Sequence, residues 1–213
     1  MARIERHADR KRADASHRRG AGMEPQRLEA FSDGVVAILI TILVLEFHVP
    51  ASGAWSALRP MLPTFYTYAL SFVFIGIYWN NHHHMLQLTD RINGGILWAN
   101  LHLLFWLSLV PFVTAWMGTH LFQAAPTALY GMVLLGAALA YIILQQAIIR
   151  VQGSDSMLAA AVGGDRKGKI SALCYIAAIV LAFVRPGVAD ALYVTVALVW
   201  LIPDRRIEGL FTR

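Results

Sequence analysis

Charged and hydroxyl side chains stand at the start of an apolar segment whose sequence, from Arg27 to Thr41, is RLEAFSDGVVAILIT. Ser32 and Asp33 directly precede its branched apolar residues. Charged groups near a membrane are costly to place, so they commonly have a function. A second polar cluster, WNNHHH at residues 79–84, ends another apolar segment. These two clusters are the first candidates for binding or chemistry.

The residue patterns give no support for an enzyme. The serines lack the glycine elbow of a hydrolase nucleophile, and neither a phosphate-cradling glycine loop nor a TVGYG filter sequence occurs. The three successive histidines project about 100° apart on a helix, whereas zinc ligands on a helix require i,i+4 spacing. We therefore expect no catalysis, no metal site and no cofactor. A hydrogen-bonding role is favoured, in which His82 or a neighbour partners Asp33 or Ser32.

The elements that carry these side chains have the composition of membrane spans. The chain is 57% hydrophobic and 15% charged, with a mean hydropathy of +0.54, whereas soluble domains are typically about 45–50% apolar. A span needs about 20 apolar residues. The sequence therefore predicts an all-α polytopic membrane protein with six transmembrane helices. Their expected ranges are 26–48, 62–86, 93–117, 126–150, 169–184 and 187–203, the last two separated by the turn Arg185-Pro186-Gly187.

Basic residues gather on one side of these spans. Every Lys and Arg except Arg59 and Arg185 falls near the N-terminus, in the loops after the second and fourth spans, or at the C-terminus. The positive-inside rule then predicts that both termini are cytoplasmic, in a multi-pass protein of the cell membrane. We expect a basic tail at 1–23 that is disordered or lies on the membrane surface, a membrane domain at 24–204, and a short basic tail at 205–213. The first tail is expected to bind anionic lipid headgroups and not nucleic acid.

A helical wheel of the first span separates two sets of residues. One face carries Phe31, Gly34, Ile38, Thr41, Ile42 and Leu45. Asp33 and Ser32 lie about 140° and about 120° from Ile38, so they are expected to face other helices of the same subunit and find partners there. Arg27 lies on a different face from Asp33 and cannot pair with it inside the helix. Composition alone favours lipid contact or helix packing for the apolar face.

The third span adds two candidate positions. Asn100 lies near the same membrane side as the other polar residues and could join their network, because membrane helices are held together by Asn and Ser. Pro111 is expected to kink the span.

These residues together resemble a known family. Arg27-x3-Phe31-Ser32-Asp33, followed by Ile38 and Thr41, resembles the signature of the transmembrane protein 175 family of potassium-permeable channels. The resemblance extends to Trp79-x2-His82 and to Asn100 and Pro111, eleven residues apart. It covers about residues 24–120 with specific residues, and beyond them only hydropathy and span count agree.

The resemblance implies a homotetramer whose first helices line a pore on the fourfold axis, with K⁺ as the permeant ion. Rings of branched apolar residues would form the constriction: Ile38, Ile42 and Leu45, with Thr41 one turn from Ile38. A polar network would position the pore helix: Arg27, Ser32, Asp33, Trp79, His82 and Asn100. Two other readings remain open at this point. One is a secondary transporter that uses the Asp33–His82 region as a proton or cation relay, and the other is a non-conducting membrane scaffold.

Overall fold

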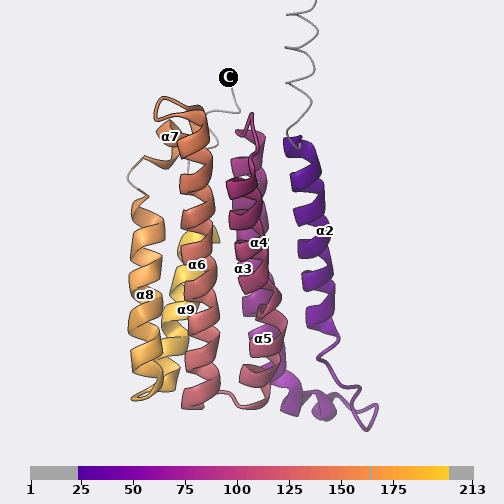
Figure 1. Ribbon diagram of the computed structural model, residues 1–213. Helices are drawn as coiled ribbons and strands as arrows, with labels where there is room; N and C mark the ends of the chain where they lie inside the picture. The colour runs from indigo at the N-terminus through magenta and orange to yellow at the C-terminus, as the bar shows by residue number, and fades with distance from the viewer. Residues whose placement is uncertain (1–23, 164, 202–213) are drawn as a thin grey trace, which may run out of the picture.

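The computed structural model describes residues 24–163 and 165–201, which form helices and connecting loops with no strand among them. Long helices that follow one another in the chain run antiparallel in one bundle, with α2 at one edge and α8 at the other (Figure 1). The predicted tail 205–213 and the tail 1–23 with its expected lipid contacts lie outside the described residues. The elements are α2 (Pro25–Val44), η1 (Trp55–Met61), α3 (Leu62–Gln87), α4 (Gly94–Ser108), α5 (Val110–Thr119), α6 (Ala124–Gln152), α7 (Met157–Val162), α8 (Arg166–Ala182) and α9 (Pro186–Leu201).

The structure does not reproduce the predicted count of six helices. The third predicted span consists of two helices, because α4 ends at Ser108 and α5 begins at Val110 with Pro111 in its first turn. Proline has no N–H to donate to the preceding turn and its ring disfavours continuation of a helix. The loop predicted after residue 150 also contains the short helix α7.

The first helix is shorter than expected. It ends at Val44, whereas the predicted span continued to residue 48. Pro50 disfavours helical geometry at the residue before it, and Glu46 and His48 interrupt the apolar run. The turn between the last two helices lies where it was predicted, because α8 ends at Ala182 and Pro186 starts α9, a position that suits its fixed backbone angle.

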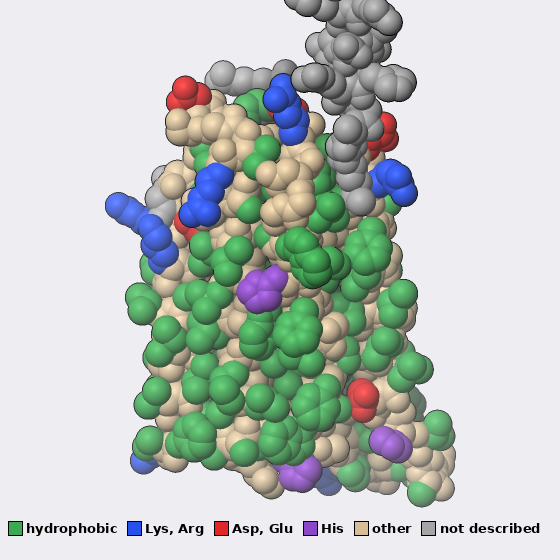
Figure 2. All heavy atoms as spheres, in the orientation of Figure 1, with side chains coloured by type: hydrophobic (Ala, Val, Ile, Leu, Met, Phe, Trp, Pro, Cys, Tyr) green, Lys and Arg blue, Asp and Glu red, His purple; other side chains and the backbone are tan. Residues whose placement is uncertain are grey.

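The helices have the composition of a membrane protein. Three described helical stretches are long and apolar enough to cross a membrane by length and composition, namely 55–87, 94–119 and 124–152, and α9 is a shorter apolar helix. Hydrophobic side chains cover the middle of the face seen in Figure 2, and Lys and Arg lie toward its ends. Arg59 in η1 and Arg185 before α9 lie at the end of the bundle opposite α7. The other basic residues of the described chain lie nearer the α7 end.

Small residues let α6 pack closely on its neighbours. A Cβ atom on Gly136 would overlap the Trp106 ring of α4, and one on Gly131 would overlap the Tyr193 hydroxyl of α9. Close approach through glycine is typical of membrane helix interfaces, where dispersion contacts replace the hydrophobic effect as the main attraction. These two glycines therefore fix how closely α4 and α9 approach α6.

Candidate functional site

The two faces of α2 differ in what covers them. Five residues are buried against α3, α4 and α5: Leu28, Ser32, Val36, Leu39 and Leu43. On the other side, Ile38 is 57% exposed and Leu45 is 75% exposed. Phe31, Thr41 and Ile42 are exposed on that side as well. The face that the wheel isolated is therefore uncovered in the single chain, and the Thr41 hydroxyl donates to the Ile38 carbonyl at 2.8 Å.

A buried chain of hydrogen bonds ties α2 to α3 and α4. His82 Nε2 donates to Asn100 Oδ1 at 2.7 Å, Asn100 Nδ2 donates to Ser32 Oγ at 2.9 Å, and Ser32 Oγ donates to the Leu28 carbonyl at 2.8 Å. Ser32 and Asn100 are fully buried and His82 is nearly so. Each of these bonds is donated in the same direction and the chain ends at a backbone carbonyl. The expected His82–Ser32 link thus runs through Asn100 and is not direct.

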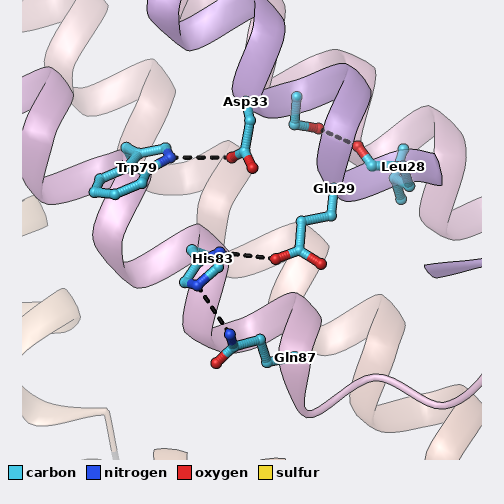
Figure 3. A network of polar contacts seen from close by, with 7 residues as sticks. Leu28, Glu29, Asp33, Trp79, His83 and Gln87 are labelled. Carbon is cyan, nitrogen blue, oxygen red and sulfur yellow. Dashed lines mark hydrogen bonds and ion pairs between the residues drawn. The ribbon is translucent and has the colours of Figure 1, made fainter. Parts of the chain in front are cut away.

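Asp33 has its partner on α3. The Trp79 indole donates from Nε1 to Asp33 Oδ1 at 3.0 Å, as Figure 3 shows. Asp33 therefore faces a helix of the same subunit, as the wheel predicts, although its partner is Trp79 and not a histidine. This bond and the His82 chain are two separate links between α2 and the helices behind it.

A third link involves residues that the sequence analysis overlooked. His83 Nδ1 lies 2.7 Å from Glu29 Oε1, and the Gln87 side-chain amide donates to His83 Nε2 at 2.9 Å (Figure 3). The His83 ring also stacks on Trp79, with centroids 5.9 Å apart. Glu29 and Asp33 on α2, and Trp79 and His83 on α3, are both i,i+4 pairs, so each pair shares a helix face. That spacing is the signal that could have identified the contact.

The histidine run does not converge on one ion. His82 faces Asn100 and His83 faces Glu29, in agreement with the divergence expected on a helix. Glu29, Asp33 and His83 are nevertheless a group with the right ligand types, because their ligand atoms lie within 4.8 Å of one another. Asp33 Oδ1 accepts from Trp79, His83 Nε2 accepts from Gln87, and His83 Nδ1 lies beside Glu29 Oε1. The group in this arrangement therefore serves helix packing.

Arg27 lies apart from these links in the described part of the protein. Its side chain is exposed, on the side of α2 that also carries Phe31. Within the described part of the chain, the hydrogen bonds and ion pairs of the network do not include it. The reason is rotational, because Arg27 lies about 120° around the helix from Asp33.

A second polar cluster lies deeper toward the α5 end of the bundle. The Ser71 hydroxyl lies 2.6 Å from the Thr114 hydroxyl and 2.9 Å from the Tyr130 hydroxyl. Tyr66 donates to Asp190 Oδ2 at 2.8 Å, and Asp190 is only 5% exposed. An acidic residue inside an apolar helix is itself a signal, which the sequence analysis did not use.

These features define a class of protein: an all-helical membrane protein whose edge helix is anchored by polar groups and presents an uncovered face of branched residues. The family model described as endosomal/lysosomal potassium channel TMEM175 matches residues 27–111. A potassium channel of Chryseobacterium sp. (strain P1-3) is 53% identical over 186 residues, which are 87% of this chain and 97% of that protein. The chain belongs to the TMEM175 family.

Other relatives agree with this assignment. A potassium channel of Streptomyces collinus (strain DSM 40733 / Tue 365) is 37% identical over 126 residues, which are 55% of this chain and 61% of that protein. The crystal structure of a lysosomal potassium-selective channel TMEM175 homolog from Chamaesiphon minutus superposes with a TM-score of 0.73 at 27% identity. That match covers 84% of this chain and 96% of the other.

Proposed function

We propose that this protein is a potassium-permeable channel of the cell membrane, formed by four copies of the chain around a central pore. The observation that carries the proposal is the uncovered face of α2, which lies at the edge of the bundle and is anchored from behind. The relatives named potassium channels supply the activity. In four symmetry-related copies, these faces would meet on the axis and become the lining of the pore.

The constriction is assigned to rings of Ile38, Ile42 and Leu45. An apolar ring offers no oxygen ligand to K⁺, so an ion must carry its water through or lose it, and a narrow ring can close by dewetting. Thr41 adds the polar atoms of this face. Its hydroxyl hydrogen is used by the Ile38 carbonyl, which leaves the lone pairs of the oxygen for a passing cation. No catalytic or cofactor chemistry is assigned.

The polar links behind α2 are assigned the task of holding that face in place. They are Ser32, Asp33, Trp79, His82 and Asn100, with Glu29 and His83 added from the structure. A pore helix needs such supports because its exposed face contributes no packing within the subunit. Arg27 lies on the exposed side at the start of α2, where it would meet neighbouring subunits.

The same proposal includes the arrangement in the membrane. Six crossings are formed by α2, α3, α4 with α5, α6, α8 and α9, and both chain ends are placed in the cytoplasm. The segregation of Arg59 and Arg185 from the other basic residues supports this orientation. The tails 1–23 and 205–213 flank the channel domain 24–204, and the first tail is assigned to anionic lipid headgroups.

The test is the reversal potential of Ile38→Asn in planar bilayers with K⁺ on one side and Na⁺ on the other. An amide at the constriction would wet the ring, so we expect the potential to move toward zero as Na⁺ permeates. Ile176→Asn is the matched control, because Ile176 is 49% exposed on α8, away from α2. An unchanged reversal potential in Ile38→Asn would refute the pore assignment. Saturable proton-coupled flux without unitary currents would indicate a transporter. An intact tetramer that shows no ion flux would indicate a scaffold.

A further inference from the structure

A cavity of about 580 Å³ lies among α3, α6, α8 and α9, remote from α2. Its volume is within the range of about 300–1,000 Å³ that is usual for small-molecule sites. The helices around it differ in described length. The described α9 has 16 residues and α6 has 29, so they span about 24 Å and about 44 Å at 1.5 Å per residue. The described part of α9 ends at a lower level than the α7 end of α6 (Figure 1).

The two ends of this cavity differ in chemistry. Its deep part is lined by apolar and aromatic side chains, including Phe74, Ile77, Ile142 and Tyr175. Phe74 and Tyr175 pack edge to face with centroids 6.3 Å apart and help close that end.

Two basic residues line the end near α7, at the start of α8. Arg166 is exposed, and Lys167 Nζ lies 5.7 Å from the centre of the Trp200 ring. The nearby Asp165 carboxylate caps α8 by accepting from the Gly168 N–H at 3.1 Å. This end of the cavity therefore carries two basic side chains beside the Asp165 carboxylate.

A buried polar group also lines the cavity. Gln145 on α6 is 7% exposed, and its Oε1 has no hydrogen-bond partner in the described part of the protein. An unsatisfied buried carbonyl oxygen costs free energy, so a ligand that donates a hydrogen bond to it is favoured. Ser171 is different, because its hydroxyl accepts from Trp200 Nε1 at 2.8 Å and donates to the Lys167 carbonyl.

We propose that this cavity binds one anionic phospholipid of the membrane leaflet at the α7 end, with its phosphate against Arg166 and Lys167. An acyl chain lies along Phe74, Ile77 and Ile142, and a hydroxyl or ammonium group of the headgroup donates to Gln145. Basic pockets between membrane helices are suited to anionic headgroups. The apolar depth favours a lipid over a free phosphate, because a small anion would leave that surface empty. The site lies within one subunit and is separate from the pore face.

The test measures lipid binding to the purified full-length protein by native mass spectrometry, with thermal unfolding as a second readout. Phosphatidylglycerol and phosphatidylcholine of matched chains are compared, and soluble glycerol phosphate is the third arm. We expect the protein to retain phosphatidylglycerol and to show a higher melting temperature when this lipid is present. Phosphatidylcholine and glycerol phosphate should have little effect. Equal effects of both lipids, or a full effect of glycerol phosphate, would overturn the proposal.

Two variants locate the site. Arg166→Gln with Lys167→Gln should weaken phosphatidylglycerol binding about thirtyfold, from the usual contribution of a basic residue near an anionic surface. Arg150→Gln with Lys169→Gln removes the same charge at the same end from residues that do not line the cavity, and should change binding little. Equal losses of phosphatidylglycerol binding in the two double variants would show that the lipid does not bind at Arg166 and Lys167, and would overturn the proposed site.

Ala138→Leu keeps the test decisive if the charge variant folds poorly. Ala138 lines the cavity, so a larger side chain should abolish the lipid-dependent rise in melting temperature while the lipid-free protein stays folded. An undiminished rise would overturn the proposal. A chain ending at residue 203 provides the last check. If it binds phosphatidylglycerol and the full chain does not, the C-terminal segment is the occupant and the lipid assignment is wrong.

Discussion

Removing the Asn100 side chain tests the buried hydrogen-bond chain at its centre. Asn100→Ala deletes the acceptor of His82 Nε2 and the donor to Ser32 Oγ, two bonds of 2.7 and 2.9 Å between helices. Ser32 keeps its bond to the Leu28 carbonyl, so its donor is still satisfied. His82 is left with a buried N–H that has lost its partner.

Two magnitudes bound the expected loss of stability. Side-chain hydrogen bonds between membrane helices average about 0.6 kcal/mol each, because the unfolded chain in a membrane also finds partners. Two such bonds give a lower bound of about 1 kcal/mol. An unsatisfied buried donor adds about 1–3 kcal/mol, so we expect a loss of about 2–4 kcal/mol in the free energy of unfolding.

The assay is unfolding of the purified protein by titration of a denaturing detergent, followed by circular dichroism. Asn81→Ala is the matched control, because among the described residues the Asn81 side-chain amide donates to the Ile77 carbonyl one turn back on its own helix and does not join two helices. This control should lower the free energy of unfolding by less than about 0.5 kcal/mol. His82→Ala and the double variant complete a cycle, in which a coupling of at least about 0.5 kcal/mol is expected. The proposed role of the hydrogen-bond chain would be refuted if Asn100→Ala left the free energy of unfolding nearly unchanged. Strict additivity of the losses caused by Asn100→Ala and His82→Ala would refute it as well.

Three further predictions concern other contacts. Asp33→Ala should lower the yield of assembled protein more than it alters ion selectivity, since Asp33 bonds to Trp79 on the side of α2 away from the proposed pore face. Size-exclusion yield and reversal potentials compare the two effects, and a full yield with altered selectivity would reverse the assignment. Gly136→Ala should destabilise the fold by about 1–3 kcal/mol through overpacking, because its Cβ would meet the Trp106 ring. Gly76→Ala is the control and should not destabilise the fold, because there is open space around Gly76. Equal melting temperatures of the two variants would contradict this prediction. Asp190→Ala should lower the melting temperature more than Asp190→Asn, which keeps an acceptor for the Tyr66 hydroxyl; the reverse order would show that the bond contributes nothing.

Much of the α2 geometry could be predicted from the sequence because one helical period governs it. The rotation between Ile38 and Asp33 places them on different faces of α2, and the structure has Ile38 on the exposed side and Asp33 against α3. The direct partners were harder to predict. Asp33 pairs with Trp79, and His82 reaches Ser32 only through Asn100, because these contacts depend on how α2, α3 and α4 are offset along the bundle axis.

Other features depend on the tertiary arrangement. The break between α4 and α5 lies just before Pro111, so the proline predicted a distortion but not that the helix would be divided. The cavity among α3, α6, α8 and α9 is lined by residues that lie far apart in the sequence. No pattern within a single helix indicates it.

The most direct test of the central claim is reactivity along α2 to a charged, water-soluble thiol reagent during bilayer recording. In a Cys174→Ser background, Ile38→Cys and Leu45→Cys should react and block the potassium current, because they lie on the proposed pore wall. Leu39→Cys and Leu43→Cys should not react, because these positions are buried within the subunit. Current that persists in Ile38→Cys and Leu45→Cys under saturating reagent would place this face in lipid and contradict the account.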